Sequence, residues 1–352
     1  MPKSRDFRIL LLPFSWIYGA IITLRNLFYS KEIFPQYKAS VPIISVGNLT
    51  TGGTGKTPMA EYLLAYFKKN GLTVAYLSRG YGRKTKGYLE VIPGKGDSEV
   101  FGDEALQVAR KFPDLPVAVC ENRKTGIERL VRDHAIHGIV LDDAFQHRKV
   151  ARDFDLIMVD ANRLPQQDHL LPAGNLREPL RNLQRAHHVV VNKLLTPSDI
   201  PGIEDLFFKT GKPVSFCKPV WSGFYDFEGK KSPTQHPKAA LIFSGIGNNA
   251  FFVRQAKEWG LDIVDTLFFP DHHAYHPADL DKIAALYRGY QKSTNFDSLI
   301  ILTTEKDYCR LSNVNGDKLL TQLPFHFVRI TLEWIQGNEQ LSQSLATLFN
   351  KT

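Results

Sequence analysis

A glycine-rich segment between an apolar run and a helical pattern constrains this chain more than any other feature. Residues 41–46 form a short apolar run, and 57–69 have helical character up to Asn70-Gly71. Between them, residues 47–57 read GNLTTGGTGKT. A strand, a glycine-rich loop and a helix in succession are the context in which a P-loop cradles phosphate with its backbone N–H groups. The segment therefore predicts a nucleoside triphosphate site.

The lysine and the threonine that end this loop have separate expected tasks. Lys56 is expected to reach the β- and γ-phosphates, and the Thr57 hydroxyl is expected to ligate Mg²⁺. The strict P-loop pattern has glycine where this chain has Thr50, so neighbouring glycines are expected to supply the flexibility. The predicted nucleotide-binding residues of the loop are Thr50, Thr51, Gly52, Gly53, Thr54, Gly55, Lys56 and Thr57.

Short apolar runs alternate with helical patterns over the next 150 residues. Continuous apolar strands separated by helices are typical of a mostly parallel sheet that is covered on both faces. The sequence therefore predicts an α/β fold of the P-loop NTPase type. The expected strands are 41–46, 73–77, 117–120, 138–141, 156–159 and 188–191, and the expected helices include 57–69, 104–111 and 124–134.

A second, smaller α/β domain is expected in the C-terminal part. Residues 218–237 interrupt the alternation and are rich in Pro, Gly, Lys and Ser. Two further strands (239–243, 298–303) and two helices (279–290, 339–349) are expected after them. The predicted division is an apolar N-terminal helix at 1–35, a P-loop core domain at 36–220, a linker at 221–237, and a C-terminal domain at 238–352 that closes over the site.

The N-terminal segment 9–24 carries no charge and is flanked by Arg8 and Arg25. Its sixteen residues fall short of the ~20 that a membrane span needs, and Pro13 disturbs the first turns. Aromatic side chains such as Trp16 suit the headgroup boundary of a bilayer. An interfacial helix is therefore favoured over a buried core helix, and a true span is the least favoured.

Composition narrows the classes of partner. The formal net charge of +8 favours anionic partners such as an acidic membrane surface or a phosphorylated substrate. No nucleic-acid-binding signature is present, so no nucleic acid is expected, and no obligate protein partner is inferred. The three cysteines, Cys120, Cys217 and Cys309, are far apart, which argues against a disulfide framework or a zinc site and favours a reducing compartment.

Three acidic or imidazole groups are candidates for chemistry. Residues 138–141 form an apolar strand followed by Asp142 and Asp143, which suits a carboxylate that reaches Mg²⁺ directly or through water. Which of the two aspartates does so stays open, and a capping pair is the alternative. Asp103 and Glu104 open a helix, where acidic residues are usual N-cap material, so an N-cap role is expected ahead of a catalytic one. Asp271 and His272 suit a metal site, a proton-abstracting pair or a surface cluster.

Taken in order, the motifs resemble one family, the tetraacyldisaccharide 4′-kinases that phosphorylate lipid A precursors in Gram-negative bacteria. The resemblance spans residues 46–307, and the apolar N-terminus matches as well. Each motif alone is only modestly specific, but the ordered set is highly specific. Thr50 is shared with the family, whereas Ala144 stands where a glycine is expected. The motifs are VGNLT and the loop up to Pro58, SRGYGR at 78–83, GDE at 102–104, LDDAFQH at 141–147, LPAG at 171–174, LREP at 176–179, FPDHH at 269–273 and TTEKD at 303–307.

The resemblance implies an ATP- and Mg²⁺-dependent enzyme that phosphorylates the 4′-hydroxyl of a tetraacylated disaccharide 1-phosphate at the cytoplasmic face of the inner membrane. It implies that Asp103 and His272 activate the hydroxyl, and that Asp142 and Asp143 organise the metal and phosphates with Lys56. It also implies that Arg177 and Glu178 lie in the nucleotide and metal site. Glu178 and Thr57 are both implied as metal ligands.

Two other classes compete with this interpretation. A membrane-attached P-loop ATPase of the partition or metallochaperone type would use hydrolysis as a switch, and the GGTGKT form of the loop is similar to theirs. Such a protein leaves Asp271 and His272 without a task. A nucleotide-binding scaffold without activity is disfavoured because Lys56, Thr57 and Asp142 are all present.

Overall fold

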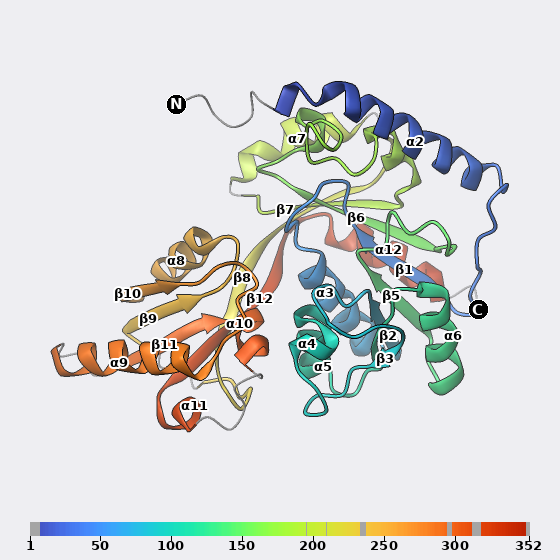
Figure 1. Cartoon of the computed structure of the whole chain (residues 1–352). Coiled ribbons are helices and arrows are strands. Elements are labelled where there is room, and N and C mark those ends of the chain that lie inside the picture. The colour runs from blue at the N-terminus through green and yellow to red at the C-terminus, as the bar shows by residue number, and fades with distance from the viewer. Residues whose placement is uncertain are drawn as a thin grey trace.

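The strands in the described residues form one continuous twelve-stranded sheet. The computed structural model describes residues 8–194, 196–208, 210–232, 237–293, 298–311 and 318–349. The strand order is β10-β9-β11-β12-β8-β7-β6-β1-β5-β2-β4-β3, and all neighbours are parallel except β12–β8 and β3–β4. Helices pack against this sheet in both halves of the molecule (Figure 1). The expected α/β fold with a mostly parallel sheet is thereby confirmed.

The P-loop half carries most of the predicted elements. Its central strands are buried along their whole length, as their unbroken apolar runs predict. Its strands are β1 (Ile43–Gly47), β2 (Val74–Ser78), β3 (Leu89–Glu90), β4 (Val117–Val119), β5 (Gly138–Asp142), β6 (Phe154–Asp160) and β7 (His188–Asn192). Its α-helices are α2 (Leu12–Ser30), α3 (Lys56–Lys69), α4 (Ser98–Phe101), α5 (Asp103–Lys111), α6 (Arg123–Asp133) and α7 (Ile200–Phe208).

The other half repeats the alternation on a smaller scale. Strand β9 is wholly buried between β10 and β11, whereas β10 is the edge strand and is only partly buried. Its strands are β9 (Ala239–Ser244), β10 (Asp262–Phe268) and β11 (Leu299–Thr304), and its helices are α8 (Asn249–Glu258), α9 (Pro277–Ser293), α10 (Glu305–Arg310) and α11 (Leu319–Gln322).

Two long antiparallel strands join the halves. Strand β8 (Val214–Asp226) pairs with β12 (Phe325–Gln336) over nearly their whole lengths, and both run from one half into the other (Figure 1). The predicted linker 221–237 begins inside β8, because its proline- and glycine-containing segment is held by this pairing up to Asp226. Residues 233–236 of that linker lie outside the described part of the chain. The division into domains stays a prediction.

The last helix returns to the P-loop half. In α12 (Asn338–Phe349), Leu341 and Leu345 are fully buried in the same core cluster as the apolar face of α3. The hydroxyl of Tyr62 on α3 donates to Asn338 Oδ1 at 2.7 Å. Although the sequence places residues 339–349 in the C-terminal domain, their packing surface therefore lies on the P-loop half.

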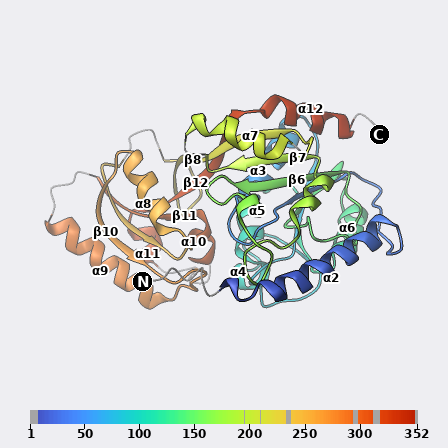
Figure 2. The ribbon, with the colours of Figure 1, turned by 90° about the horizontal axis from the view of Figure 1, so that it is seen from above.

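Helix α2 lies on the other side of strands β6 and β7 from α12 (Figure 2). Its inner side is polar and bonded: Ser15 Oγ donates to Leu170 O at 2.9 Å, and Tyr18 Oη donates to Arg177 O at 2.8 Å. Its outer side is apolar and exposed. No helix in the described residues is long and apolar enough to cross a membrane. The interfacial role of α2 stays a prediction.

We predict that His188 makes the fold sensitive to mild acid. Its side chain is fully buried, Nε2 lies 2.7 Å from Ser215 Oγ, and that hydroxyl donates to Gly337 O, so Nε2 must carry the hydrogen of the neutral ring. Burial lowers the pKa of His188 to about 4. A folded pKa below the unfolded value of about 6.5 gives stability that is present above pH 6.5 and lost as pH falls towards 4.

The free energy of unfolding should therefore fall by about 3 kcal/mol between pH 7 and pH 4 through this group alone. A His188→Gln variant can still donate to Ser215, so it should lose that part of the pH dependence in urea titrations. The exposed His169→Gln variant serves as the control and should behave as the wild type. Equal acid sensitivity in all three proteins would show that protonation of His188 does not limit stability.

Candidate active site

The P-loop connects β1 to α3, and its conformation depends on glycine at one point above all. Gly55 has a φ of 97°, and a β-carbon there would lie 2.2 Å from the side-chain amide of Asn192. Thr54 is fully buried and accepts a hydrogen bond from Asn48 Nδ2 at 3.2 Å, so its side chain shapes the loop from inside. Helix α3 begins at Lys56, which directs the N-terminal backbone N–H groups of the helix at the loop.

A short backbone pairing attaches a distant segment to the first half of the loop. The amide of Thr51 donates to Asn175 O at 2.8 Å, and the amide of Arg177 donates to Leu49 O at 2.7 Å. Thr50 is nearly buried in this pairing, opposite Leu176. The pairing brings Arg177 to the loop from more than a hundred residues away, and its role in nucleotide binding stays a prediction.

The end of β7 supports the second half of the loop. Asn192 Nδ2 donates to Thr54 O at 3.0 Å, and Lys193 Nζ donates to Gly53 O at 2.6 Å. Lys193 also pairs with Asp160 at the end of β6, at 2.8 Å. Because both side chains bond to loop carbonyls, they hold the loop while leaving its N–H groups for phosphate.

The two aspartates after β5 point to different partners. Asp142 is 2% exposed, accepts a hydrogen bond from Tyr76 Oη at 2.7 Å, and lies 3.5 Å from the Thr57 hydroxyl. Asp143, with a φ of 49°, turns away from the strand. It is bonded through both oxygens to Arg177 at 2.9 and 3.0 Å, and its Oδ1 lies 3.6 Å from Lys56 Nζ.

These surroundings push the two pKa values apart. Burial raises the pKa of Asp142 to about 6, and the negative charge of Glu104 adds to the effect. Burial also opposes ionisation of Asp143, but the charges of Lys56 and Arg177 outweigh it and hold its pKa below the usual range. Asp143 is therefore an ionised carboxylate between two cations, whereas Asp142 is a buried carboxyl group with a raised pKa.

The donor set fits Mg²⁺ at Thr57 and Asp142. A hydroxyl and a buried carboxylate that face each other across 3.5 Å match the way P-loop proteins bind Mg²⁺, which takes most remaining ligands from phosphate and water. No three His, Cys, Asp or Glu side chains in the described residues form a closed ligand cage. The fit therefore favours a metal shared with the nucleotide over one held by the protein alone.

Glu178 has other partners. Its side chain is fully buried, and Oε2 accepts hydrogen bonds from Arg185, from Asn182 at 2.7 Å, and from Asn26 of α2 at 3.2 Å. These contacts tie α2 to the segment that carries Arg177. They do not include Thr57, Asp142 or Asp143. The contacts of Glu178 therefore do not support its predicted role as a metal ligand, and that role stays a prediction.

Asp103 and His272 meet at the junction between the halves. Asp103 is the first residue of α5, and His272 lies in the turn between β10 and α9 with a φ of 60°. His272 Nδ1 lies 3.4 Å from Asp103 Oδ2. Arg310, at the end of α10, donates to the same oxygen from Nε at 2.9 Å and from Nη2 at 2.6 Å. The predicted pair is thus brought together, with an arginine that the sequence did not indicate.

The charges of this cluster keep Asp103 ionised. Burial alone would raise the pKa of Asp103, but the hydrogen bond with His272 and the charge of Arg310 outweigh it and hold the pKa well below the usual range. The hydrogen bond to Asp103 raises the pKa of His272, while burial and Arg310 oppose that rise. Asp103 is therefore an anion near neutral pH, poised to accept a proton only when a donor is placed against it.

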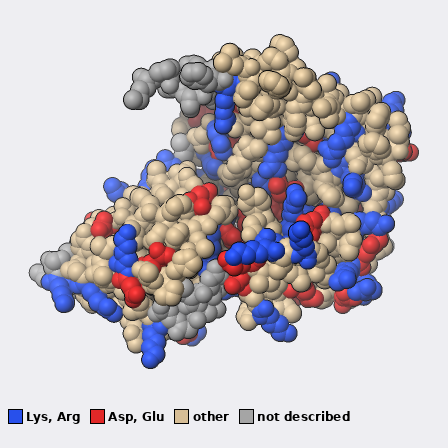
Figure 3. Space-filling model, viewed as in Figure 1, with Lys and Arg blue, Asp and Glu red and all other residues tan. Residues whose placement is uncertain are grey.

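A second ion pair continues this cluster towards the P-loop. Lys306 Nζ donates to Glu104 Oε1 at 2.9 Å, from α10 to α5. The charges of Lys306 and Lys56 both lower the pKa of Glu104, the former the more, and Glu104 in turn raises that of Asp142. Acidic and basic groups from both halves thus form one electrostatic system around the loop, and charged side chains gather at the junction in Figure 3.

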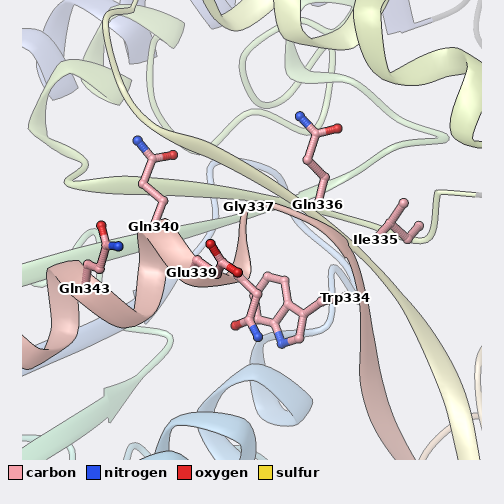
Figure 4. Close-up of a pocket in the computed structure, with 8 residues that line it drawn as sticks. Trp334, Ile335, Gln336, Gly337, Glu339, Gln340 and Gln343 are labelled. Atoms are coloured by element: carbon pink, nitrogen blue, oxygen red, sulfur yellow. The ribbon is translucent and has the colours of Figure 1, made fainter.

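One pocket of the molecule lies away from this site. A pocket of about 470 Å³ lies at the turn from β12 to α12 and is lined by Trp334, Gln336, Glu339 and Gln343 among others (Figure 4). None of the predicted site residues lines it. Lys306 lies in the TTEKD motif of the sequence analysis, whereas no motif there includes Lys193, Tyr76 or Arg310.

We predict that Lys193 contributes to nucleotide affinity by holding the loop. Lys193→Met removes the hydrogen bonds to Gly53 O and to Asp160, so the Kd for an ATP analogue should rise about tenfold, as expected for losing about 1.4 kcal/mol. Calorimetric titration measures this directly. Lys218→Met is the matched control, because Lys218 pairs with Glu333 on β8 and β12, away from the loop. Equal affinities would mean that the loop keeps its shape without Lys193.

Comparison with known proteins identifies the family of this chain. The family model described as tetraacyldisaccharide-1-P 4′-kinase, LpxK, matches residues 7–350. The tetraacyldisaccharide 4′-kinase of Chlorobaculum tepidum is 36% identical over 355 residues, covering 99% of each chain. That of Parabacteroides distasonis is 38% identical over 352 residues, covering 96% of this chain and 94% of its own.

A solved structure extends the likeness to three dimensions. LpxK from Aquifex aeolicus, crystallised in complex with ATP, superposes with a TM-score of 0.79 at 32% identity. The alignment covers 97% of this chain and 99% of that one. With a family model matched over nearly its whole length and relatives above 30% identity, this chain belongs to the tetraacyldisaccharide-1-P 4′-kinase family.

Proposed function

We propose that the chain transfers the γ-phosphoryl group of ATP to the 4′-hydroxyl of a tetraacyldisaccharide 1-phosphate, which yields the 1,4′-bisphosphate of lipid A biosynthesis. The observation that carries this proposal is the Asp103–His272 pair at the junction beside the P-loop. A hydrolytic switch needs only a positioned water, whereas a carboxylate–imidazole pair supplied from two halves suits a second substrate with a hydroxyl. The names of the relatives agree with this acceptor.

Each charged group then has a task in the transfer. Lys56 and the loop N–H groups neutralise the phosphate oxygens, and Arg177 holds Asp143 in place beside Lys56. Asp103 accepts the proton of the sugar hydroxyl, with His272 as its partner. Thr57 and Asp142 would hold Mg²⁺, which on binding supplies positive charge to the phosphates. Most of the rate enhancement comes from alignment and charge stabilisation rather than from the base.

Closure of the two halves completes the site in this proposal. Lys56 and Asp142 belong to one half, and His272 belongs to the other. The halves are joined by the β8–β12 pair and contact each other through α5 and α10. Bending of this pair would bring His272 to the acceptor hydroxyl and exclude water from the phosphates.

Helix α2 is the proposed membrane contact. Phe14, Ile17, Ile21 and Leu24 recur at helical spacing and are 51–60% exposed, and Trp16 is 70% exposed. Figure 3 shows the surface over α2 as largely uncharged. An acceptor with four acyl chains stays in a bilayer, because each CH₂ exposed to water costs ~0.8 kcal/mol. We place the enzyme on the cytoplasmic face of the bacterial inner membrane, where ATP and an anionic lipid surface are both available.

The first test is transfer of ³²P from γ-labelled ATP to a tetraacyldisaccharide 1-phosphate in detergent. The wild type should label the lipid, and Asp103→Asn should lower kcat by about 10²–10⁴-fold because the general base is lost. Asp279→Asn is the matched control, since Asp279 pairs with His273 at 2.9 Å outside the site. Steady phosphate release without labelled lipid would instead support the ATPase switch.

The second test addresses the membrane. Changing Trp16, Ile17 and Ile21 together to serine should lower binding to anionic vesicles by at least about 100-fold, given about 1.5–3 kcal/mol for each buried side chain. Co-sedimentation measures the partition, and a detergent assay should show retained kinase activity. Ile92→Ser with Phe268→Ser is the control, since both residues are exposed elsewhere. Equal partition of the two variants would remove α2 as the anchor.

A further inference from the structure

Arg310 is a buried cation at the centre of the junction between the halves. Its side chain is only 4% exposed, and it is the last residue of α10. Both Nε and Nη2 donate to Asp103, and Nη2 also lies 3.2 Å from His272 Nδ1. A planar guanidinium with two donors on one carboxylate oxygen restricts the rotation of that carboxylate far more than a single contact does.

The guanidinium nitrogen that does not contact Asp103 is also hydrogen-bonded. Nη1 donates to Gly245 O and to Asp307 Oδ1, the latter at 3.3 Å. Asp307 is fully buried and accepts further hydrogen bonds from the Gly245 amide and Tyr275 Oη, each at 3.0 Å, and from Thr304 Oγ1 at 2.7 Å. Arg310 therefore approaches Asp103 from a rigid support in the other half, rather than as a free surface side chain.

The contacts that Arg310 and His272 make with Asp103 involve only one of its two carboxylate oxygens. Arg310 and His272 both approach Oδ2. Within the part of the chain that the structure describes, Oδ1 has no hydrogen-bond partner. One oxygen of the carboxylate is thus used for orientation, and the other is left for a ligand.

We propose that Arg310 is a positioning residue for phosphoryl transfer, which holds Asp103 by Oδ2 so that Oδ1 faces the acceptor hydroxyl. This inference rests on the proposed kinase function. In the transfer, the hydroxyl proton passes to Oδ1 while the hydroxyl oxygen bonds to the γ-phosphorus. The bond from the γ-phosphorus to the bridging oxygen breaks, and ADP leaves with that electron pair.

The charges around the pair make this role measurable. His272 faces Asp103, Arg310 and Asp271, and its ring lies 5.8 Å from that of Tyr81. Asp103 faces Arg310, His272 and Lys306. Arg310 opposes protonation of His272, so removal of its charge should raise the pKa of that imidazole. A residue that stabilised the fold from elsewhere, such as Arg329 in its pair with Glu305, would not move this pKa.

The test compares Arg310→Gln, Arg310→Lys and Arg329→Gln. Arg329 is the matched control, because it forms a similar buried ion pair with Glu305 at 2.8 Å but has no contact with Asp103. Arg310→Gln should lower kcat for lipid phosphorylation by about 100-fold, the order expected when a reacting group is misplaced. KM for ATP should stay within about twofold of the wild-type value, since Arg310 does not touch the P-loop. Arg310→Lys should recover part of kcat.

An NMR titration of ¹³C-labelled histidine gives the second readout. The pKa of His272 should rise in Arg310→Gln and stay unchanged in Arg329→Gln. Two results would overturn the inference about Arg310 and leave the proposed kinase function intact. These are equal kcat values for Arg310→Gln and Arg329→Gln in an active enzyme, or an unchanged pKa of His272 in Arg310→Gln. Absence of labelled lipid with the wild type would overturn the proposed kinase function and this inference with it, and thermal unfolding of each variant separates either outcome from loss of the fold.

Discussion

The parallel pairing of β1 with β5 and β6 is the constraint on which the nucleotide site depends. Val46 lies opposite Asp142 in that register, so the P-loop and the two aspartates leave the sheet at the same edge. One strand further, Asp160 lies opposite Asn192, which brings the supports of the loop to that edge too. In open α/β sheets, ligands bind at the carboxyl ends of the strands because the loops there converge.

A different kind of contact builds the rest of the site. Asp103 and Glu104 of α5 meet Arg310 and Lys306 of α10 as buried or half-buried ion pairs, and the β8–β12 ribbon joins the two halves behind them. Burying such a pair costs desolvation free energy, which the attraction between the two charges offsets only in part. These pairs are therefore better explained by the orientation that they give to the side chains than by a gain in the stability of the fold. The groups proposed to bind the nucleotide belong to one half, whereas the placement of the groups proposed to act on the acceptor depends on how the halves meet.

Much of the fold and of the nucleotide site could be predicted, because local patterns along the sequence specify them. The expected strand 138–141 and helix 57–69 match β5 and α3 within a residue or two, since apolar runs and helical periodicity are local properties. Residues 218–237 were expected to interrupt the alternation, with a linker at 221–237, yet residues 218–226 belong to strand β8, because pairing with β12 outweighs local propensity. The contacts of Glu178 with Arg185 and α2 likewise depend on a chain reversal that no local pattern shows.

By itself, the sequence determined the P-loop, the strand that ends in Asp142 and Asp143, the α/β class and, through the order of its motifs, the family. These follow from residue types at short spacing, whose chemistry does not depend on the rest of the chain. Only the tertiary structure decided that Arg310 shares Asp103 with His272, that Lys193 holds the loop, and that Asp142 and Asp143 face different partners. Each of these depends on side chains from distant segments, whose distance and burial set hydrogen bonds and pKa values that spacing along the chain cannot encode.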